Sequence, residues 1–263
     1  MSRDFDVTVP NPARMWNYWL GGKDNFAADR AAGDQVIDAL PTMPLVARGA
    51  RRFLIDAVDQ LVTEHGVRQF IDIGSGLPAA DNTHEVAQRA APAARVLYVD
   101  HDPVVTSHGK ALLASGDGAT EIVQADLRDT AAIIAEARKT LDFSQPVAVL
   151  LIAVLHFIPD ADDPYDIVAR LMAALPAGSY LVIGHGASDI EPAAAAELTR
   201  RYNELSPVKI RLRRREEITP FFAGLEPVGP GLVPLARWWS GPAAAGADTA
   251  TGLVGYVGIA KKS

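Results

Sequence analysis

The sequence predicts an α/β fold in which helices cover both faces of a doubly wound, seven-stranded, mostly parallel sheet with an antiparallel last strand. Short apolar runs alternate with segments of helical character from residue 69 onward. Several of these runs are continuously apolar, which is typical of parallel strands buried on both faces. Strands that alternate with helices in this way indicate β-α-β units.

A helical extension is expected before the sheet, over residues 1–66, and the sheet-forming domain over residues 67–263. Within the extension, residues 48–64 predict an amphipathic helix, because apolar side chains such as Phe53 and Ala57 recur at helical spacing. Four prolines are expected to separate the helical segments: Pro10, Pro12, Pro41 and Pro44.

The first strand, residues 69–73, contains Asp72 near its end and runs into the turn Gly74-Ser75-Gly76. Glycines at the carboxyl end of a buried strand let the backbone turn sharply and approach a ligand, since no Cβ stands in the way. These four residues are therefore candidate cofactor ligands. Ordinary tight turns use the same glycine pattern, so the motif alone leaves both interpretations open.

The second strand, residues 95–100, follows a crossover helix expected over residues 81–90 and also ends in an acid. A carboxylate at this tip accepts hydrogen bonds from the hydroxyl groups of a ribose, which makes Asp100 a candidate ligand. The other interpretation is a cap on the next helix, which would begin at Pro103 with Asp100 or Asp102 as its N-cap residue. The two roles are compatible if each acid takes one of them.

The nature of the cofactor depends on the residues around the glycines. The pattern fits NAD as well as S-adenosylmethionine, because Ala79 at the third glycine position of the dinucleotide fingerprint is an allowed variant. Asp72 favours S-adenosylmethionine, since a carboxylate attracts the ammonium group of a methionine moiety and repels a pyrophosphate.

The third strand, residues 121–127, ends in Asp126 and Leu127, a pair suited to accept a hydrogen bond from an adenine amino group and to cover its ring. The fourth, residues 147–156, is the most apolar and is expected beside the first strand, with Ala153 to His156 as the floor of the site. The remaining elements are expected as a helix over residues 164–175, a strand over 179–185, a helix over 192–205, and antiparallel strands over 225–235 and 253–260.

Several motifs along the chain match one bacterial family. The most diagnostic is NPARMWNYWLGGKDNFAADR at residues 11–30, followed by FIDIGSGLP at 70–78 with NTHE at 82–85. Shorter matches are YVDHDP at 98–103, DLR at 126–128, VLHFIPD at 154–160 and PGLVP at 230–234. On these motifs the chain resembles class I S-adenosylmethionine-dependent methyltransferases, and more narrowly the bacterial DUF574 family.

This resemblance implies a Rossmann-like fold, S-adenosylmethionine as cofactor and methyl transfer to an unidentified small-molecule acceptor. It also favours a lid in which Tyr18 and Gly21 close over the cofactor, because methyl transfer requires that water be kept from the sulfonium. From the residues alone, the aromatic side chains of this segment are equally well explained as a staple onto the core. His101, on the adenine side of the site, stands where many relatives carry a polar amide.

A hydroxyl acceptor would also need a base. His156, just after the fourth strand, and His185, at the end of the fifth, are the candidates, because ligands bind at this edge of open α/β sheets and imidazole titrates in the useful range. Each histidine is equally well explained as a packed side chain. No metal is predicted, since three nearby acids are expected to cap the next helix: Asp160, Asp162 and Asp163.

The composition limits the possible partners. The 263 residues are 49% hydrophobic, contain no cysteine and carry a net charge of −7. Disulfides and thiolate metal sites are therefore excluded, and the acidic balance disfavours nucleic acid as a partner.

The longest apolar run, residues 147–155, is far shorter than the ~20 residues of a membrane helix, so no membrane contact is expected. Nothing near residue 1 resembles a signal peptide, so a cytoplasmic location is expected. The oligomeric state is left open.

The main exception to this balance is a basic segment, residues 209–215, which carries five Lys and Arg side chains. We expect a solvated face partly neutralised by Glu216 and Glu217 at the start of a short helix, with an acidic ligand as the alternative.

Two other functions are compatible with these observations. One is an NAD(P)-dependent oxidoreductase, which the acid-x-Gly-x-Gly order and the Asp126-Leu127 pair disfavour. The other is a non-catalytic sensor that binds S-adenosylmethionine without turnover.

Overall fold

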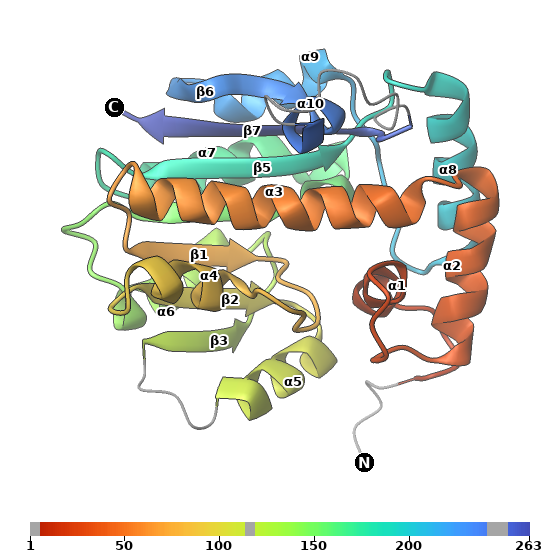
Figure 1. The fold of residues 1–263 in the computed structure, drawn as a ribbon, viewed down its shortest axis with the longest axis horizontal. Coiled ribbons are helices and arrows are strands. Elements are labelled where there is room, and N and C mark those ends of the chain that lie inside the picture. Colours follow the sequence, from red (N-terminus) through yellow and green to blue (C-terminus); the bar gives the residue numbers. More distant parts are fainter. Residues whose placement is uncertain (1–5, 114–118, 241–251) are drawn as a thin grey trace.

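The computed structural model describes residues 6–113, 119–240 and 252–263, and its central feature is one sheet flanked by helices (Figure 1). The strands are β1 Gln69–Ile73, β2 Arg95–Asp100, β3 Thr120–Gln124, β4 Ala148–Ile152, β5 Tyr180–Gly186, β6 Leu225–Pro234 and β7 Gly255–Lys262. The α-helices are α1 Pro12–Trp19, α2 Ala27–Ala39, α3 Met43–Thr63, α4 Thr83–Ala90, α5 Pro103–Leu113, α6 Thr130–Thr140, α7 Pro164–Ala173, α8 Pro192–Leu205, α9 Arg215–Ile218 and α10 Leu235–Ser240.

The sheet has seven strands in the order β3-β2-β1-β4-β5-β7-β6. The five strands β1 to β5 are parallel, and β7 runs antiparallel to both of its neighbours. The predicted fold is therefore confirmed. From β1 the chain adds β2 and β3 on one side, and it then returns to add β4 on the other side of β1. Open α/β sheets bind ligands at the carboxyl ends of the two strands that flank such a switch in strand order, here β1 and β4.

The two faces of the sheet carry separate apolar clusters, because successive residues of a strand point to opposite sides. Phe70 packs in the cluster that contains α3 and α4 residues, and its neighbour Ile71 packs in the cluster with α6 and α7 residues. All five residues of β1 are buried. This continuous burial explains why the strand is apolar without alternation and why Asp72 is carried into the interior.

The N-terminal extension contributes directly to the sheet's covering layer. The long helix α3 lies over one face of the sheet, along the direction of the strands (Figure 1), and its buried side chains share one cluster with Phe70 and Val182. It begins at Met43, earlier than predicted, because Pro44 lies in its first turn, where the missing N–H is not needed. Treating Pro44 as a breaker was therefore wrong.

Two predicted strands end earlier than the apolar pattern indicated. The fourth strand, β4, stops at Ile152 because Ala153 adopts a positive φ of 55°, and His156 then lies in a short 3-10 helix, Leu155–Phe157. The third strand, β3, stops at Gln124, so the Asp126-Leu127 pair follows the strand. In both cases the candidate residues lie on loops at the carboxyl edge of the sheet.

None of the helices in the described part of the chain is long and apolar enough to cross a membrane.

Candidate functional site

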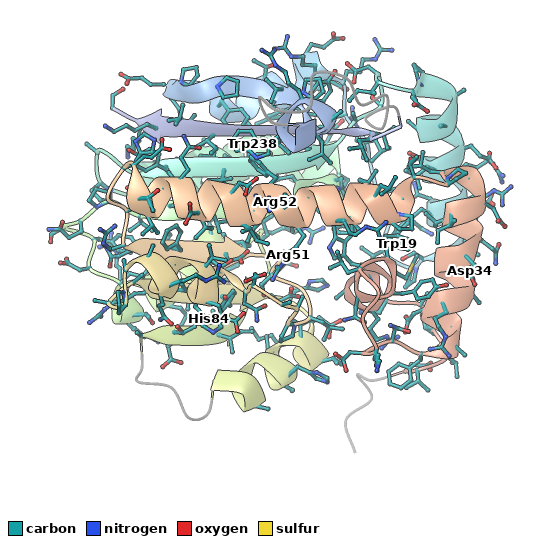
Figure 2. All side chains as sticks on the ribbon, viewed as in Figure 1. Trp19, Asp34, Arg51, Arg52, His84 and Trp238 are labelled. Atoms are coloured by element: carbon teal, nitrogen blue, oxygen red, sulfur yellow. The ribbon has the colours of Figure 1, made fainter. Side chains whose placement is uncertain are left out.

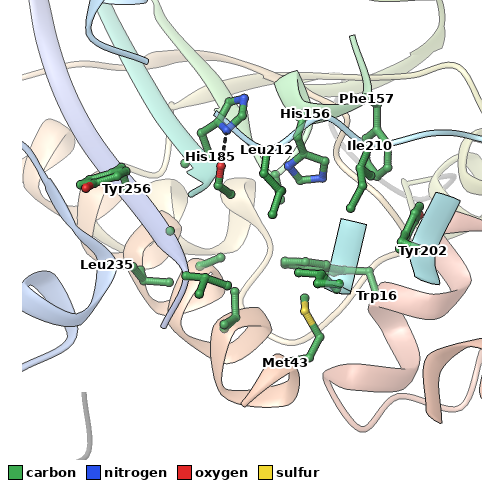
Figure 3. Close-up of a pocket in the computed structure, with 18 of the residues that line it drawn as sticks. Trp16, Met43, His156, Phe157, His185, Tyr202, Ile210, Leu212, Leu235 and Tyr256 are labelled. Atoms are coloured by element: carbon green, nitrogen blue, oxygen red, sulfur yellow. Dashed lines mark hydrogen bonds between the residues drawn. The ribbon is translucent and has the colours of Figure 1, made fainter. Parts of the chain in front are cut away.

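Two adjoining cavities open at the carboxyl edge of the sheet. We call the first the glycine-loop cavity; it lies between α1, α3 and the ends of β1, β2 and β4, and Asp72, Gly74, Gly76 and Asp100 are among its walls. We call the second the apolar cavity; it is bounded by α1, α3, α8 and the ends of β5 and β7 (Figure 3). Five residues line both cavities and form a shared wall: Pro12, Trp16, Ala50, Ala153 and Phe157.

The glycine loop is shaped differently at its two glycines. Gly74 has φ +72°, and a Cβ there would lie 2.5 Å from a methyl group of Val154, so only glycine fits. Gly76 has φ +67°, and a Cβ there would meet no atom within 4 Å. The first glycine therefore allows close packing of the strand end, and the second leaves open space beside the backbone for a ligand.

Asp100 is the buried acid of this cavity, with a side chain that is 6% exposed. Its Oδ2 accepts a hydrogen bond from Gly76 N at 2.9 Å, and its Oδ1 accepts one from Asp102 N at 3.0 Å. Burial raises the pKa of Asp100, against the opposing effect of these two N–H groups. Each oxygen keeps acceptor capacity for a ligand. Asp102 takes the capping role at α5, where it accepts from Val104 N at 2.7 Å.

Asp72 and Arg51 bring opposite charges to the same cavity. Asp72 is 4% exposed; its Oδ2 accepts from the Thr83 hydroxyl at 2.6 Å, and burial raises its pKa to about 6 despite that bond. Arg51 extends from α3 (Figure 2), and its Nη2 donates to the carbonyls of Ala80 and Asp81 at 2.9 Å. Its Nε is buried without a hydrogen-bond partner, so this guanidinium has an unused donor.

A side recess continues past Asp100 and contains the other predicted residues. His101, Asp126 and Leu127 line it together with Gly74 and Asp100. Leu127 is 5% exposed and supplies an apolar surface. Asp126 accepts a hydrogen bond from Arg128 N at 2.9 Å and pairs with the Arg128 guanidinium at 3.0 Å. The recess therefore combines an apolar surface with a carboxylate at its rim.

His156 lines the apolar cavity, and neither of its ring nitrogens has a hydrogen-bond partner among the described residues; Nδ1 is buried. Burial, with a smaller contribution from the Arg213 charge, lowers the pKa of His156 to about 4. The imidazole is therefore neutral near pH 7 and has a free lone pair.

His185 also lines the apolar cavity, but both of its nitrogens are engaged. Its Nδ1 lies 2.8 Å from Gly186 O, and its Nε2 lies 3.0 Å from the Arg213 guanidinium. Since arginine only donates, Nε2 must be the acceptor and Nδ1 must carry the proton. Burial and the neighbouring His156 lower the pKa of His185 well below its usual value. His185 is thus held as a neutral ring with no free lone pair.

Arg213 is 0% exposed, although it belongs to the basic segment that we expected on a solvated face. Its guanidinium donates to the carbonyls of Leu155 and Ile158 at 3.0 and 2.8 Å, and to Asp160 at 2.8 Å. The expectation of a wholly solvated segment was therefore wrong, because this cation holds the loop that carries His156.

The acids before α7 have separate partners. Asp160 pairs with Arg211 and Arg213, and Asp162 pairs with Arg128 at 2.6 Å. Asp163 caps α7 by accepting from Asp166 N. Within the ranges that the structure describes, no group of three potential ligands is placed to hold a metal ion.

Tyr18 and Gly21 do not line either cavity. The Tyr18 hydroxyl donates to Asp34 on α2 at 2.6 Å, so its ring lies on the side of α1 that faces α2. Trp16, two residues earlier on the same helix, lines both cavities. Residues two apart on a helix point in different directions, which is why the motif at residues 11–30 contributes a different aromatic residue from the one predicted.

Three further residues of the site were not among those predicted: Trp16, Arg51 and Arg213. Each was missed because its surroundings in the sequence indicate another role. Trp16 lies in an aromatic cluster, Arg51 at the edge of an amphipathic helix, and Arg213 in a basic run.

The chain is similar to known proteins over its whole length. A family model described as S-adenosyl methyltransferase matches residues 1–263. A solved structure of a DUF574 family protein from Streptomyces avermitilis has 40% sequence identity and a TM-score of 0.92, covering 98% of this chain and 99% of that chain. A protein from Thermobifida fusca has 38% identity and a TM-score of 0.89, with 98% and 97% covered.

More distant structures share the fold alone. The N-methyltransferase NodS from Bradyrhizobium japonicum, in complex with S-adenosylhomocysteine, has 13% identity and a TM-score of 0.50, covering 89% of this chain and 97% of that chain. No curated protein matches the chain.

Proposed function

This chain belongs to the S-adenosyl methyltransferase family, and on that premise we propose that it transfers a methyl group from S-adenosylmethionine to a small-molecule acceptor. The observation that carries the proposal is the presence of opposite charges in the glycine-loop cavity. Asp72 and Arg51 line this one cavity together with Asp100, a buried acid at a strand tip.

These groups match the charges of the cofactor. Arg51 is suited to bind the methionine carboxylate, since charge-assisted bonds from arginine to a carboxylate are strong and directional. Asp72 is suited to accept from the methionine ammonium group. Asp100 is suited to accept from the ribose hydroxyls, and the open space at Gly76 lets the backbone approach the ligand.

The side recess supplies the surroundings for an adenine ring. Leu127 offers an apolar surface to the ring, and Asp126 and His101 offer polar groups at its edge. Ser75 lies between the two glycines and also lines the main cavity. We therefore assign the cofactor to the glycine-loop cavity and its side recess.

The protein's own task is to orient the reactants and to accept a proton. S-adenosylmethionine supplies an activated methyl group on a positively charged sulfur. Ala153 and Trp16 line both cavities, so they lie where the cofactor and the acceptor would meet. Between the two histidines we assign the base to His156, because His185 has no free lone pair.

Calorimetric titration with S-adenosylhomocysteine and NAD tests the proposal directly. Binding of S-adenosylhomocysteine without NAD is the expected result, and binding of NAD alone would reject the proposal in favour of an oxidoreductase. Methyl transfer to any acceptor would reject the non-catalytic sensor.

The positions of the ligand groups are tested with 5′-methylthioadenosine, which lacks the amino acid part of the cofactor. Arg51→Ala should weaken S-adenosylhomocysteine binding by about 1.5–3 kcal/mol and leave 5′-methylthioadenosine unchanged. Asp100→Ala should weaken both ligands by about 1–3 kcal/mol. The matched control is Arg52→Ala on the next position of α3 (Figure 2), whose guanidinium pairs with Asp56 at the surface. If Arg51→Ala weakens both ligands equally, the carboxylate assignment is wrong.

A further inference from the structure

We infer that the apolar cavity is the acceptor site, and that the acceptor is an uncharged, flat aromatic molecule that carries a hydroxyl group. The inference rests on the proposed function for the nature of the reaction. The placement of the cavity rests on the shared residues alone: Trp16, Ala153 and Phe157 line both cavities, so a molecule in the apolar cavity lies directly beside the glycine-loop cavity.

The exclusion of charge follows from the lining of the apolar cavity. Among the described residues that line it, none is Asp, Glu, Lys or Arg. His185 is neutral because Arg213 occupies its Nε2, and His156 is neutral because its surroundings disfavour the charged ring. A charged acceptor would therefore lose its hydration without gaining a counter-ion, which costs several kcal/mol. The glycine-loop cavity, with Asp72, Asp100 and Arg51, is the opposite case.

The flat shape follows from the rings that surround the space. Trp16 and Met43 face His156 and Leu212 across the cavity (Figure 3). The ring centroids of Phe157 and Tyr202 lie 6.3 Å apart, within the range of aromatic contacts. An aromatic molecule stacks on such walls and loses little conformational freedom.

The hydroxyl group follows from His156. Its unpaired imidazole is the one basic group with a free lone pair among the described residues of the lining, and an acceptor O–H satisfies it by donating a hydrogen bond. In the reaction, an oxygen lone pair forms the bond to the methyl carbon while the carbon–sulfur bond breaks and its electron pair goes to sulfur. The hydroxyl proton passes to a ring nitrogen of His156 and then to water. An oxygen that is becoming an ether is strongly acidic, so even a weakly basic imidazole takes its proton.

The test uses 2-naphthol as the probe, titrated calorimetrically into the protein with and without saturating S-adenosylhomocysteine. Two charged molecules with the same ring system serve as comparisons: 2-naphthoate and 2-naphthylmethylammonium. We expect 2-naphthol to bind at least about ten-fold more tightly than either. We also expect 2-methoxynaphthalene, which lacks the donor, to bind more weakly than 2-naphthol, and this difference to disappear in His156→Ala.

A matched pair of variants on α3 locates the bound probe. Val46 lines the apolar cavity, whereas its neighbour Leu45 is 40% exposed. Val46→Phe fills part of the cavity and should weaken 2-naphthol binding by about ten-fold, with S-adenosylhomocysteine affinity unchanged as evidence of correct folding. Leu45→Phe adds the same atoms at the surface and should change neither affinity.

The outcomes separate this inference from the proposed function. The acceptor class would be overturned if a charged comparison bound as tightly as 2-naphthol or more tightly, or if no probe bound. It would also be overturned if 1-octanol, an uncharged alcohol without a ring, bound more tightly than 2-naphthol. Unchanged 2-naphthol binding in Val46→Phe would overturn the site. If S-adenosylhomocysteine does not bind, the proposed function fails, and the titration without it still decides whether the cavity holds the probe.

Discussion

The two cavities share a wall but are built in contrasting ways. The glycine-loop cavity takes its two buried acids from the tips of β1 and β2 and its cation, Arg51, from α3. Asp100 accepts from backbone N–H groups, and Asp72 accepts from the Thr83 hydroxyl. The apolar cavity takes its walls from α1, α3, α8 and the C-terminal strands, and its polar groups are neutral. The two acids of the first cavity thus lie at strand ends that the sequence pattern marks, whereas the walls of the second come from segments that only folding brings together.

The largest effect is expected at Arg213, whose buried guanidinium donates to the loop beside the apolar cavity. Arg213→Met removes a buried cation and leaves His185 and two carbonyls without their donor, while Asp160 keeps its pair with Arg211. Each buried acceptor left unsatisfied costs about 1–3 kcal/mol, so the variant should lose at least about 3 kcal/mol of unfolding free energy, measured by urea denaturation. Arg214→Met is the control, since that side chain is 65% exposed. Equal stability of the two variants would show that the apolar side does not depend on this cation.

The next effect distinguishes the two glycines of the other cavity. Gly74→Ala forces a Cβ to within 2.5 Å of Val154 at a positive φ, and should destabilise the fold by about 2–4 kcal/mol. Gly76→Ala has the same backbone strain without the clash, so its loss should be about 1 kcal/mol. Thermal unfolding measures both. Cofactor affinity should nevertheless fall in Gly76→Ala, and normal binding by that variant would argue against a ligand beside Gly76.

A pH titration of cofactor binding should separate the charged cavity from the neutral one. Asp72 has a pKa of about 6 in the folded protein, so its charged form, to which the proposed function assigns the cofactor's ammonium group, is lost as the pH falls through that value. S-adenosylhomocysteine affinity should therefore rise with pH up to about 6, by as much as about ten-fold per pH unit below it, and then level off. Asp72→Asn should flatten the profile, and 2-naphthol affinity should not follow it.

The same group has the opposite effect on the stability of the free protein. Its pKa is raised from 3.8 to about 6 by burial, so the folded state favours the protonated carboxyl. Asp72 therefore contributes to the free energy of unfolding in full below pH 3.8, and this stabilising contribution is lost as the pH rises through about 6.

The smallest expected effect is a shift in the midpoint of the pH profile of S-adenosylhomocysteine binding. The Thr83 hydroxyl donates to Asp72 and lowers its pKa, so Thr83→Val should move the midpoint of the binding profile upward by about one pH unit. Calorimetry across pH 5–8 measures the shift. A downward shift, or none, would mean that this bond does not control the ionisation of Asp72.

The sequence predicted the sheet and the strand-tip residues because their signals are local. Continuous apolar runs identify buried strands, and an acid or glycine at the end of a run must lie at the carboxyl edge. Strand ends were less predictable, since apolar residues continue past Ile152 and only the positive φ of Ala153 ends the strand. The cofactor roles of these residues, and the closing of the extension as a lid, stay predictions.

The apolar cavity could not be predicted in the same way. Nothing in the sequence distinguishes Val46, which lines the cavity, from apolar residues of α3 that fill the core. Arg213 was hidden among exposed basic neighbours, because its burial depends on Asp160 and on loop carbonyls more than 50 residues away. Trp16 and Tyr18 are both aromatic residues of α1, and only the side of the helix on which each lies decides that Trp16 lines the cavities and Tyr18 faces α2.

On the proposed function, the shared wall also makes the binding equilibria of cofactor and acceptor interdependent. Because Trp16, Ala153 and Phe157 belong to both cavities, a ligand that shifts any of them in one cavity alters the surface that the other ligand meets. Thermodynamic linkage requires the effect to be mutual: the factor by which the cofactor changes the acceptor's dissociation constant equals the factor by which the acceptor changes the cofactor's. This wall of a few side chains is therefore where cooperativity between the two ligands would originate.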